Sequence, residues 1–201
     1  MSNEPQKKNK GQAIKQIFGS TADDAPYVTV KHNIITPVSS LISHKYTFIL
    51  EALIDFNTTF TFADFTNNNG LFASLIAQDF NNARCTVVSQ NPKNLQACKQ
   101  VQEMFKLSNL TYEEADLFTT ASQSDITLHE NATIMLLKKY SAKKLAKHIA
   151  TTTQKQTIVE IPSATMDIAS QTILADKFEH VNTLLAELLY HFLLVTYIPI
   201  I

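Results

Sequence analysis

Short apolar runs typical of buried strands alternate with segments of helical periodicity along the middle of this chain. Strands of this kind are expected at 60–65, 85–89, 110–116, 132–138 and 156–161. Helices are expected to begin after Ser39 or Ser40 and at Pro92, and to cover 71–80 and 141–153. A polar segment without a long helix is expected between the third and fourth strands.

This alternation constrains the fold class. Strands that are apolar along most of their length are typical of parallel sheets covered on both faces. The sequence therefore predicts an α/β fold with a doubly wound, mainly parallel sheet, whose ligand would bind at the carboxyl ends of the strands. The side chains expected to be buried in the strands are Phe62, Val87, Val88, Ile134, Leu136, Ile158 and Val159.

Both ends of the chain depart from the alternation. Residues 1–24 are polar and lysine-rich, so we expect a mobile tail that precedes a single domain at 25–201. Near the other end, 181–193 carries apolar residues on a broad helical stripe, which predicts a buried helix followed by a last strand. Polar residues interrupt this stripe, and its apolar run is shorter than the ~20 residues that a membrane-spanning helix needs. No membrane segment is therefore expected.

The charge of the chain bears on its partners. The 17 basic and 18 acidic residues give a net charge of -1, so no overall field attracts nucleic acid or anionic membranes. Arg84 is the only arginine, and sequence-specific reading of nucleic acid is not expected. A group of lysines near i, i+4 spacing forms either a basic face for RNA or a solvated helix surface. Its members are Lys139, Lys143, Lys144 and Lys147.

Cysteine and histidine residues give no pattern of a metal site or a disulfide framework. Cys85 and Cys98 do not form a CxxC pair, and no Cys/His spacing typical of zinc occurs, so reduced and buried thiols are expected. The first residues, MSNEPQKKNKGQ, lack the apolar core of a secretory signal. A cytoplasmic location is therefore expected.

Three blocks of sequence follow one another between Phe60 and Phe118: ADFTNNNGLFAS, CTVVSQNPKNLQ and EEADLF. The first block resembles the L-D-I-G-C-N-N-G-x-F-S pattern of class I S-adenosylmethionine-dependent methyltransferases, and the other two follow at a family-like spacing. The resemblance implies a Rossmann-like methyltransferase fold, S-adenosylmethionine as cofactor, and methyl transfer to an acceptor that the sequence does not identify.

The resemblance also implies cofactor-binding positions. Asp64 matches the acid that ends the first strand, and Gly70 matches the last glycine of the loop after it. Asn68 stands at the middle glycine, where asparagine is tolerable because it adopts left-handed backbone conformations more easily than most residues. Asp116 matches the residue that usually receives the adenine amino group.

Two positions depart from the family pattern. Thr66 stands where the family keeps a glycine, and a β-branched residue is strained at positive φ. Ser89 stands where an acid normally accepts both ribose hydroxyls. Two hypotheses follow. The chain is a methyltransferase of unidentified substrate, or it is a non-catalytic methyltransferase-like domain that has lost its cofactor and serves as a scaffold, with the apolar C-terminus contacting a protein partner.

The acceptor chemistry stays open at this stage. Lys138, Lys139 and Tyr140 stand where many amino-group methyltransferases have an Asn/Asp-Pro-Pro-aromatic motif, so N-methylation of a base is not supported. Lys45, Lys138 and Glu160 loosely resemble the Lys/Asp/Lys/Glu set of ribose 2′-O-methyltransferases, but a lysine stands where that family has its acid. No catalytic residue is assigned.

Overall fold

The computed structural model describes most of the chain, and the backbone alone for 4–9, 161–162 and the last two strands. The described residues are 4–20, 24–54, 56–65, 69–115, 123–130, 148–149, 151–162, 178–185 and 192–199. Their helices and strands are α1 (Glu4–Phe18), β1 (Val28–Lys31), β2 (Ile34–Pro37), α2 (Ser40–Ala52), β3 (Phe60–Phe65), α3 (Leu71–Asp79), β4 (Ala83–Ser89), α4 (Pro92–Phe105), β5 (Leu110–Glu114), β6 (Ser124–His129), β7 (Thr153–Pro162), β8 (Phe178–Leu185) and β9 (Phe192–Pro199).

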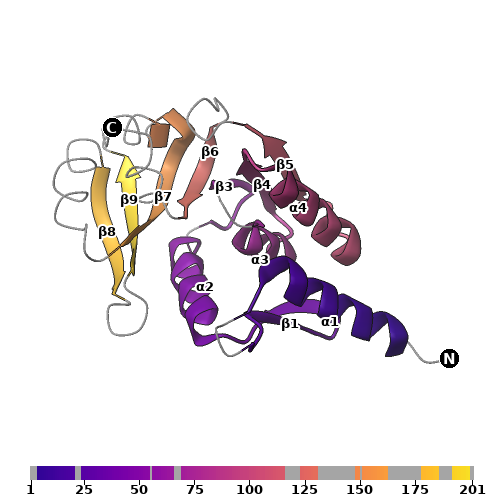
Figure 1. The fold of residues 1–201 in the computed structure, drawn as a ribbon. Coiled ribbons are helices and arrows are strands. Elements are labelled where there is room, and N and C mark those ends of the chain that lie inside the picture. Colours follow the sequence, from indigo (N-terminus) through magenta and orange to yellow (C-terminus); the bar gives the residue numbers. More distant parts are fainter. Residues whose placement is uncertain are drawn as a thin grey trace.

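One sheet of seven strands organises the structure, in the order β5-β4-β3-β6-β7-β9-β8 (Figure 1). The strands β5, β4, β3, β6 and β7 all pair in parallel. The strand β9 runs antiparallel to both β7 and β8. The expected fold, a doubly wound and mainly parallel α/β sheet, is confirmed.

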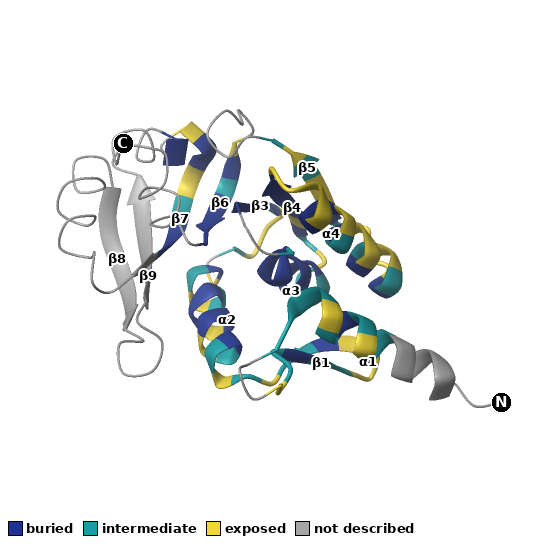
Figure 2. Cartoon of the chain, viewed as in Figure 1, coloured by how far each residue is buried: buried dark blue, intermediate teal, exposed yellow. Residues whose placement is uncertain are grey.

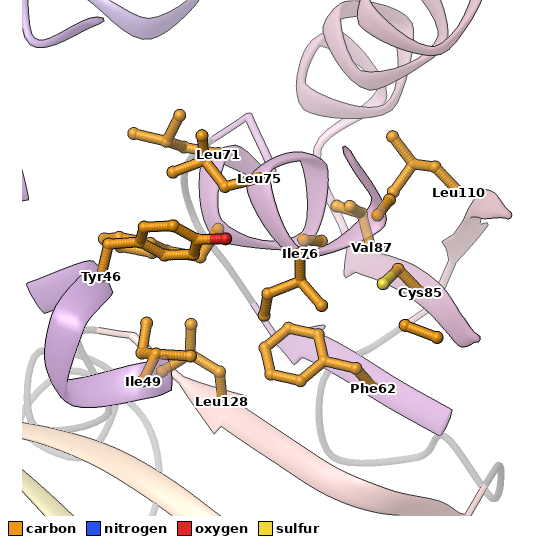
Figure 3. Packing of buried hydrophobic residues seen from close by; sticks show 14 of the residues in the cluster. Tyr46, Ile49, Phe62, Leu71, Leu75, Ile76, Cys85, Val87, Leu110 and Leu128 are labelled. Carbon is orange, nitrogen blue, oxygen red and sulfur yellow. The ribbon is translucent and has the colours of Figure 1, made fainter. Parts of the chain in front are cut away.

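The core lies between this sheet and the helices α2, α3 and α4. Residues 71–77 of α3 are buried without exception, so this part of the helix is covered on all sides (Figure 2). It packs onto apolar side chains of the strands, among them Phe62, Val87 and Leu128 (Figure 3). Five strand residues that the sequence expected to be buried are so: Phe62, Val87, Val88, Ile158 and Val159. The other two, Ile134 and Leu136, lie outside the described residues.

The strand beside β3 differs from the expected one. The sequence pattern assigned this position to 132–138, which lies outside the described residues, but Ser124–His129 forms it instead as β6. This segment alternates polar and apolar residues. Its polar side chains fit the interior because they bond to one another: His129 Nε2 lies 3.1 Å from Thr127 Oγ1. Glu130, and not Lys138, therefore follows this strand directly.

The expected mobile tail at 1–24 is wrong for residues 4–18, which form α1. The helix docks because a small apolar stripe, in which Ile14 is fully buried, meets the core. Polar contacts fix it as well: the Lys10 ammonium donates to the Met104 carbonyl at 2.7 Å and to Asn33 Oδ1 at 2.7 Å. The lysine-rich composition concealed this stripe. The expected start of the domain at residue 25 therefore lies after a helix that packs on the core. That the chain forms a single domain remains a prediction.

A hairpin that the sequence analysis did not identify follows α1. The strands β1 and β2 pair antiparallel, with Lys31 opposite Ile34, so the loop has two residues. His32 and Asn33 have φ values of 49° and 66°, as a type I′ turn requires. Asparagine and histidine are among the residues that tolerate such angles best.

The C-terminal helix expected at 181–193 is wrong for 181–185 and 192–193, and the residues between them lie outside the described chain. The backbone forms β8 over Phe178–Leu185 and β9 over Phe192–Pro199. An apolar run of this length suits a buried strand as well as a helix, and pairing with the sheet edge at β7 decides the outcome here. Within the part of the chain that the structure describes, no helix has the length and apolar character to cross a membrane.

The docking of α1 is testable. Ile14→Ala is expected to lower the free energy of unfolding by about 2–5 kcal/mol, because it leaves a cavity at a fully buried site. Gln16→Ala, at an exposed position of the same helix, is the control and should change it by less than about 0.5 kcal/mol. Urea denaturation of the two variants measures both values. Equal stabilities would show that α1 does not dock.

Candidate functional site

The strand order reverses between β3 and β6, since β4 and β5 extend the sheet to one side and β7 to the other. Such a reversal opens a crevice at the carboxyl ends of the strands, where ligands of doubly wound sheets bind. Asp64 and Phe65 end β3 at this edge, Ser89 ends β4, and Glu130 follows β6.

Asp64 is a carboxyl group with little solvation. Its residue is 0% exposed, and Oδ2 accepts one long hydrogen bond, 3.4 Å, from the Ala73 amide in the first turn of α3. Oδ1 has no hydrogen-bond partner among the described residues. Burial raises the pKa of Asp64 well above its usual range, the charge of Glu130 raises it further, and the Ala73 amide opposes both. A buried carboxyl group with so few hydrogen bonds lowers the stability of the folded protein. Groups with such a raised pKa are typical of functional sites.

Gly70 fixes the position of α3 above the sheet. Its φ of 68° lies in the left-handed region, and a Cβ built there would lie 2.4 Å from Cγ2 of Val87 in β4. Only glycine allows this approach. The neighbouring Asn69 donates a hydrogen bond from its amide to the Ile17 carbonyl of α1. The loop before α3 is thereby tied to both the sheet and the N-terminal helix.

Ser89 is engaged within its own turn. Its side chain is buried, and Oγ accepts hydrogen bonds from the Asn91 amide at 3.1 Å and from Asn94 Nδ2 at 3.3 Å. Asn91 in turn caps α4 by accepting from the Lys93 amide at 3.1 Å. The hydroxyl therefore already organises the start of α4 and offers no negative charge at the end of β4.

A cavity of about 310 Å³ lies at this edge. It is lined by residues of α1, α2, α4 and the start of α3, by the segment before β1, and by Glu130 after β6. Lys45 and Glu130 are its charged lining residues, and both are nearly buried. The remaining lining residues are Ile17, Phe18, Tyr27, Leu41, Ile42, Asn69, Leu71, Phe72 and Asn94.

A buried ion pair borders the cavity. Lys45 Nζ of α2 lies 3.0 Å from Glu160 Oε1 of β7, and the two side chains are 11% and 10% exposed. Both residues belong to the set expected from sequence, but their contact was not expected. Lys138, from the same set, lies outside the described chain.

Behind the crevice, the other face of the sheet holds two histidines. The His129 ring stacks on Phe65 at 4.7 Å between centroids, and His148 meets both rings edge-on. Burial lowers the pKa of His129 well below its usual value, and His148 lowers it further. His129 is therefore a neutral packing residue. Among the described residues, no group of three His, Cys, Asp or Glu side chains could hold a metal ion.

The structure brings together only part of the site expected from sequence. Asp64, Gly70 and Ser89 lie at one edge, while Thr66, Asn68 and Asp116 lie outside the described residues. The sequence analysis missed several lining residues. Glu130 was not expected because the segment that forms β6 was expected to be a polar connection, and Asn94 carried no signal. The α1 residues were hidden by the expectation of a mobile tail.

Comparisons with known proteins bear on the fold. The sequence matches no known family profile and no curated protein. Solved structures do match. Magnesium protoporphyrin IX methyltransferase ChlM from Synechocystis PCC 6803, with bound SAH, has a TM-score of 0.66 at 14% identity, covering 97% of this chain and 96% of its own. N-methyltransferase NodS from Bradyrhizobium japonicum WM9 has a TM-score of 0.61 at 15% identity, covering 78% and 95%. At these identities the likeness establishes the fold: this chain folds as a class I methyltransferase does.

The contact at Gly70 gives a matched pair of variants. Gly70→Ala is expected to lower the free energy of unfolding by about 2–4 kcal/mol, because it adds both overpacking against Val87 and strain at positive φ. Gly11→Ala in α1, where an added Cβ meets nothing within 4 Å, should instead raise it by about 0.5–1 kcal/mol. Urea denaturation compares the two. A neutral Gly70→Ala would contradict the close packing of α3 on β4.

The state of Asp64 predicts a pH dependence. Because its folded pKa is raised, the native state holds this proton more tightly than the unfolded state, and the free energy of unfolding falls as pH rises from about 4 toward the folded pKa. Asp64→Asn removes the effect, so the variant gains stability relative to the unmodified protein across this window. Unfolding of both proteins from pH 3 to pH 8 measures the difference, in which the His129 contribution cancels. Parallel curves would show that Asp64 is well solvated.

Proposed function

We propose that this chain, which has the fold of class I S-adenosylmethionine-dependent methyltransferases, binds S-adenosylmethionine at the carboxyl ends of β3, β4 and β6 and transfers its methyl group. The bound cofactor would supply an electrophilic methyl group on a sulfonium ion. The protein's part is to hold the cofactor, to exclude water, and to let an acceptor approach in line.

The observation that carries the proposal is the buried carboxyl of Asp64. An acid that is fully buried and has an oxygen without a partner among the described residues costs stability unless a ligand satisfies it. S-adenosylmethionine carries an ammonium group on its amino-acid part, which suits such a carboxylate. The proximity of Glu130 adds negative charge at the same place.

The remaining residues fit the cofactor in part. Gly70 allows the loop to lie close to the sheet, and the aromatic rings of Phe18, Tyr27 and Phe72 give the cavity apolar walls. Ser89 fits less well. A neutral hydroxyl that already accepts two hydrogen bonds is a weak partner for a ribose diol. We therefore expect weak binding of the cofactor.

The second candidate is a non-catalytic methyltransferase-like domain that serves as a scaffold. The observation in its favour is again Ser89, because its hydroxyl supports the start of α4 in place of a ligand. In this case the function of the chain would be to bind protein partners, through its apolar C-terminus or elsewhere. Binding of RNA by the lysines at 139–147 also stays a prediction, since these residues lie outside the described chain.

Titration calorimetry with S-adenosylmethionine and S-adenosylhomocysteine tests the cofactor. Asp64→Asn is expected to weaken binding about ten- to a hundred-fold, the loss of one hydrogen bond to a charged group. The control is Asp125→Asn at the opposite end of β6, where the carboxylate accepts from Thr61 and pairs with Lys155. This variant should leave affinity unchanged. Unaltered binding by Asp64→Asn would remove the main support for the proposal.

Ser89→Asp is the complementary gain-of-function variant and should strengthen binding by about tenfold or more. Combination with Thr66→Gly tests the second departure from the family pattern. Low-micromolar binding by the unmodified protein would overturn the expectation of weak affinity and favour an enzyme. Absence of binding even in the double variant would favour the scaffold.

A further inference from the structure

A second cavity, of about 590 Å³, lies at the amino-terminal ends of the parallel strands. Residues of β3, β4, β5 and β6 and of the loops that lead into β4 and β5 line it. Six of the eleven lining residues carry a hydroxyl group, three carry a side-chain amide, and Arg84 carries a charge. No described residue in this lining is acidic or aromatic. A cavity of this size and polarity suits a small hydrophilic molecule.

This cavity lies on the face of the sheet that points away from α3. Successive side chains of a strand point to opposite faces of a sheet. Cys85 and Val87 of β4 lie in the core with α3 (Figure 3). Arg84 and Thr86 alternate with them and therefore point to the other face, and Thr111 of β5 stands beside Thr86 in the parallel register. The cavity is thus separated from the proposed cofactor site, which lies at the opposite ends of the strands.

Arg84 gives the cavity its charge. It is the only arginine of the chain, it is exposed, and no hydrogen bond or ion pair joins its guanidinium to another described residue. Asn81 and Ser108, in the same lining, are exposed and likewise donate to no other described residue. Asp125 bonds to the lining residue Thr61 but is paired with Lys155 at 2.9 Å. The charge of Arg84 is therefore not balanced within this part of the structure.

Two threonine hydroxyls in the lining offer acceptors instead of donors. Thr111 donates its hydroxyl proton to the Cys85 carbonyl at 3.1 Å. Thr86 Oγ1 lies 3.0 Å from Thr111 Oγ1, and because a hydroxyl has one proton, Thr86 is the donor of this second bond. Both oxygens keep lone pairs that can accept from a ligand. A matching ligand therefore carries an anionic group for Arg84 and hydroxyl groups for Thr86 and Thr111.

We propose that this cavity binds a small phosphorylated polyhydroxy compound of the sugar phosphate class, with its phosphate at Arg84 and its hydroxyl groups donating to Thr86 and Thr111. The planar guanidinium binds two phosphate oxygens at once. Asn81 and Ser108 supply further neutral donors, which suits a group with three terminal oxygens better than a carboxylate with two. Single-stranded nucleic acid is a poorer match, because its bases stack on aromatic side chains. The inference does not depend on the proposed function.

The competing explanation is that Arg84 is an ordinary charged surface residue that attracts anions only through its general field. Removal of any exposed positive charge would then weaken anion binding to a similar extent. Lys99 of α4 provides the matched control, because it is exposed and does not line this cavity. The role of the threonines separates the explanations further, since a general field does not distinguish phosphate from a sugar phosphate of equal charge.

The experiment is titration calorimetry at constant ionic strength with three ligands: ribose 5-phosphate, inorganic phosphate and ribose. The proteins are the unmodified chain, Arg84→Gln, Thr86→Val and the control Lys99→Gln. The first and last of these substitutions each remove one positive charge, and Thr86→Val removes a hydroxyl group with little change of shape. Circular dichroism establishes that each variant is folded.

The unmodified chain and Lys99→Gln are expected to bind ribose 5-phosphate equally, with a Kd of about 1 mM or lower, and more tightly than inorganic phosphate or ribose. Arg84→Gln should weaken binding of ribose 5-phosphate about ten- to a hundred-fold, the loss of one hydrogen bond to a charged group. Thr86→Val should reduce the preference for ribose 5-phosphate over inorganic phosphate.

Three results would overturn the inference. The first is that neither ribose 5-phosphate nor inorganic phosphate binds the unmodified chain. The second is an equal loss of affinity in Arg84→Gln and Lys99→Gln, which would indicate a general field. The third is equal affinity of the unmodified chain for ribose 5-phosphate and inorganic phosphate, which would remove the role of the threonines. None of them bears on the proposed function, because the cofactor would bind at the other ends of the strands.

Discussion

The close approach of α3 to β4 at Gly70 determines the geometry of the whole candidate site. Because position 70 has no Cβ, the helix begins directly above Val87, where any larger residue would collide. That start brings the Ala73 amide to Asp64 and the Asn69 side chain to the α1 carbonyl at Ile17. The same start places Leu71 and Phe72 in the lining of the cavity. One backbone contact thus links the sheet, the N-terminal helix and the crevice.

Several ionisable side chains are buried at the edge of the sheet above this contact, in contrast to the apolar core around α3. The core around α3 is built from aliphatic and aromatic side chains, whereas the crevice gathers Asp64, Glu130 and the Lys45–Glu160 pair with little exposure. Folding alone gives no reason for this concentration, since each buried charge costs free energy. A ligand with complementary charges gives one. The location agrees with that reason, because the reversal of strand order puts the crevice there.

The sequence predicted four of the five parallel strands, β3, β4, β5 and β7, because these strands depend on local signals. The apolar runs of β3, β4 and β7 and the proline at the start of α4 are readable one segment at a time. The wrong predictions concern segments whose structure depends on tertiary contacts. The strand β6 contains Thr127 and His129, whose burial depends on partners in other strands, and α1 docks through Ile14 although its composition is that of a tail. Asp64, Gly70 and Ser89 could be named from sequence, but the pairing of Lys45 with Glu160 spans 115 positions and had no local signal.

Ser89 stands where the family pattern has an acid, and this difference affects which part of the cofactor would contribute most to the binding energy. A carboxylate at the end of β4 would favour the ribose end of a nucleoside ligand, and the hydroxyl here serves Asn91 and Asn94 instead. The charged residues that remain near this edge of the sheet are Lys45, Asp64 and Glu130, and all three are buried. On the proposed function, recognition would then depend more on the amino-acid part of the cofactor than on its ribose. On the same proposal, such a site would distinguish the cofactor from simple nucleosides, which lack that part. It would tolerate weak contacts at the ribose, because hydrogen bonds to charged groups contribute more free energy than those between neutral groups.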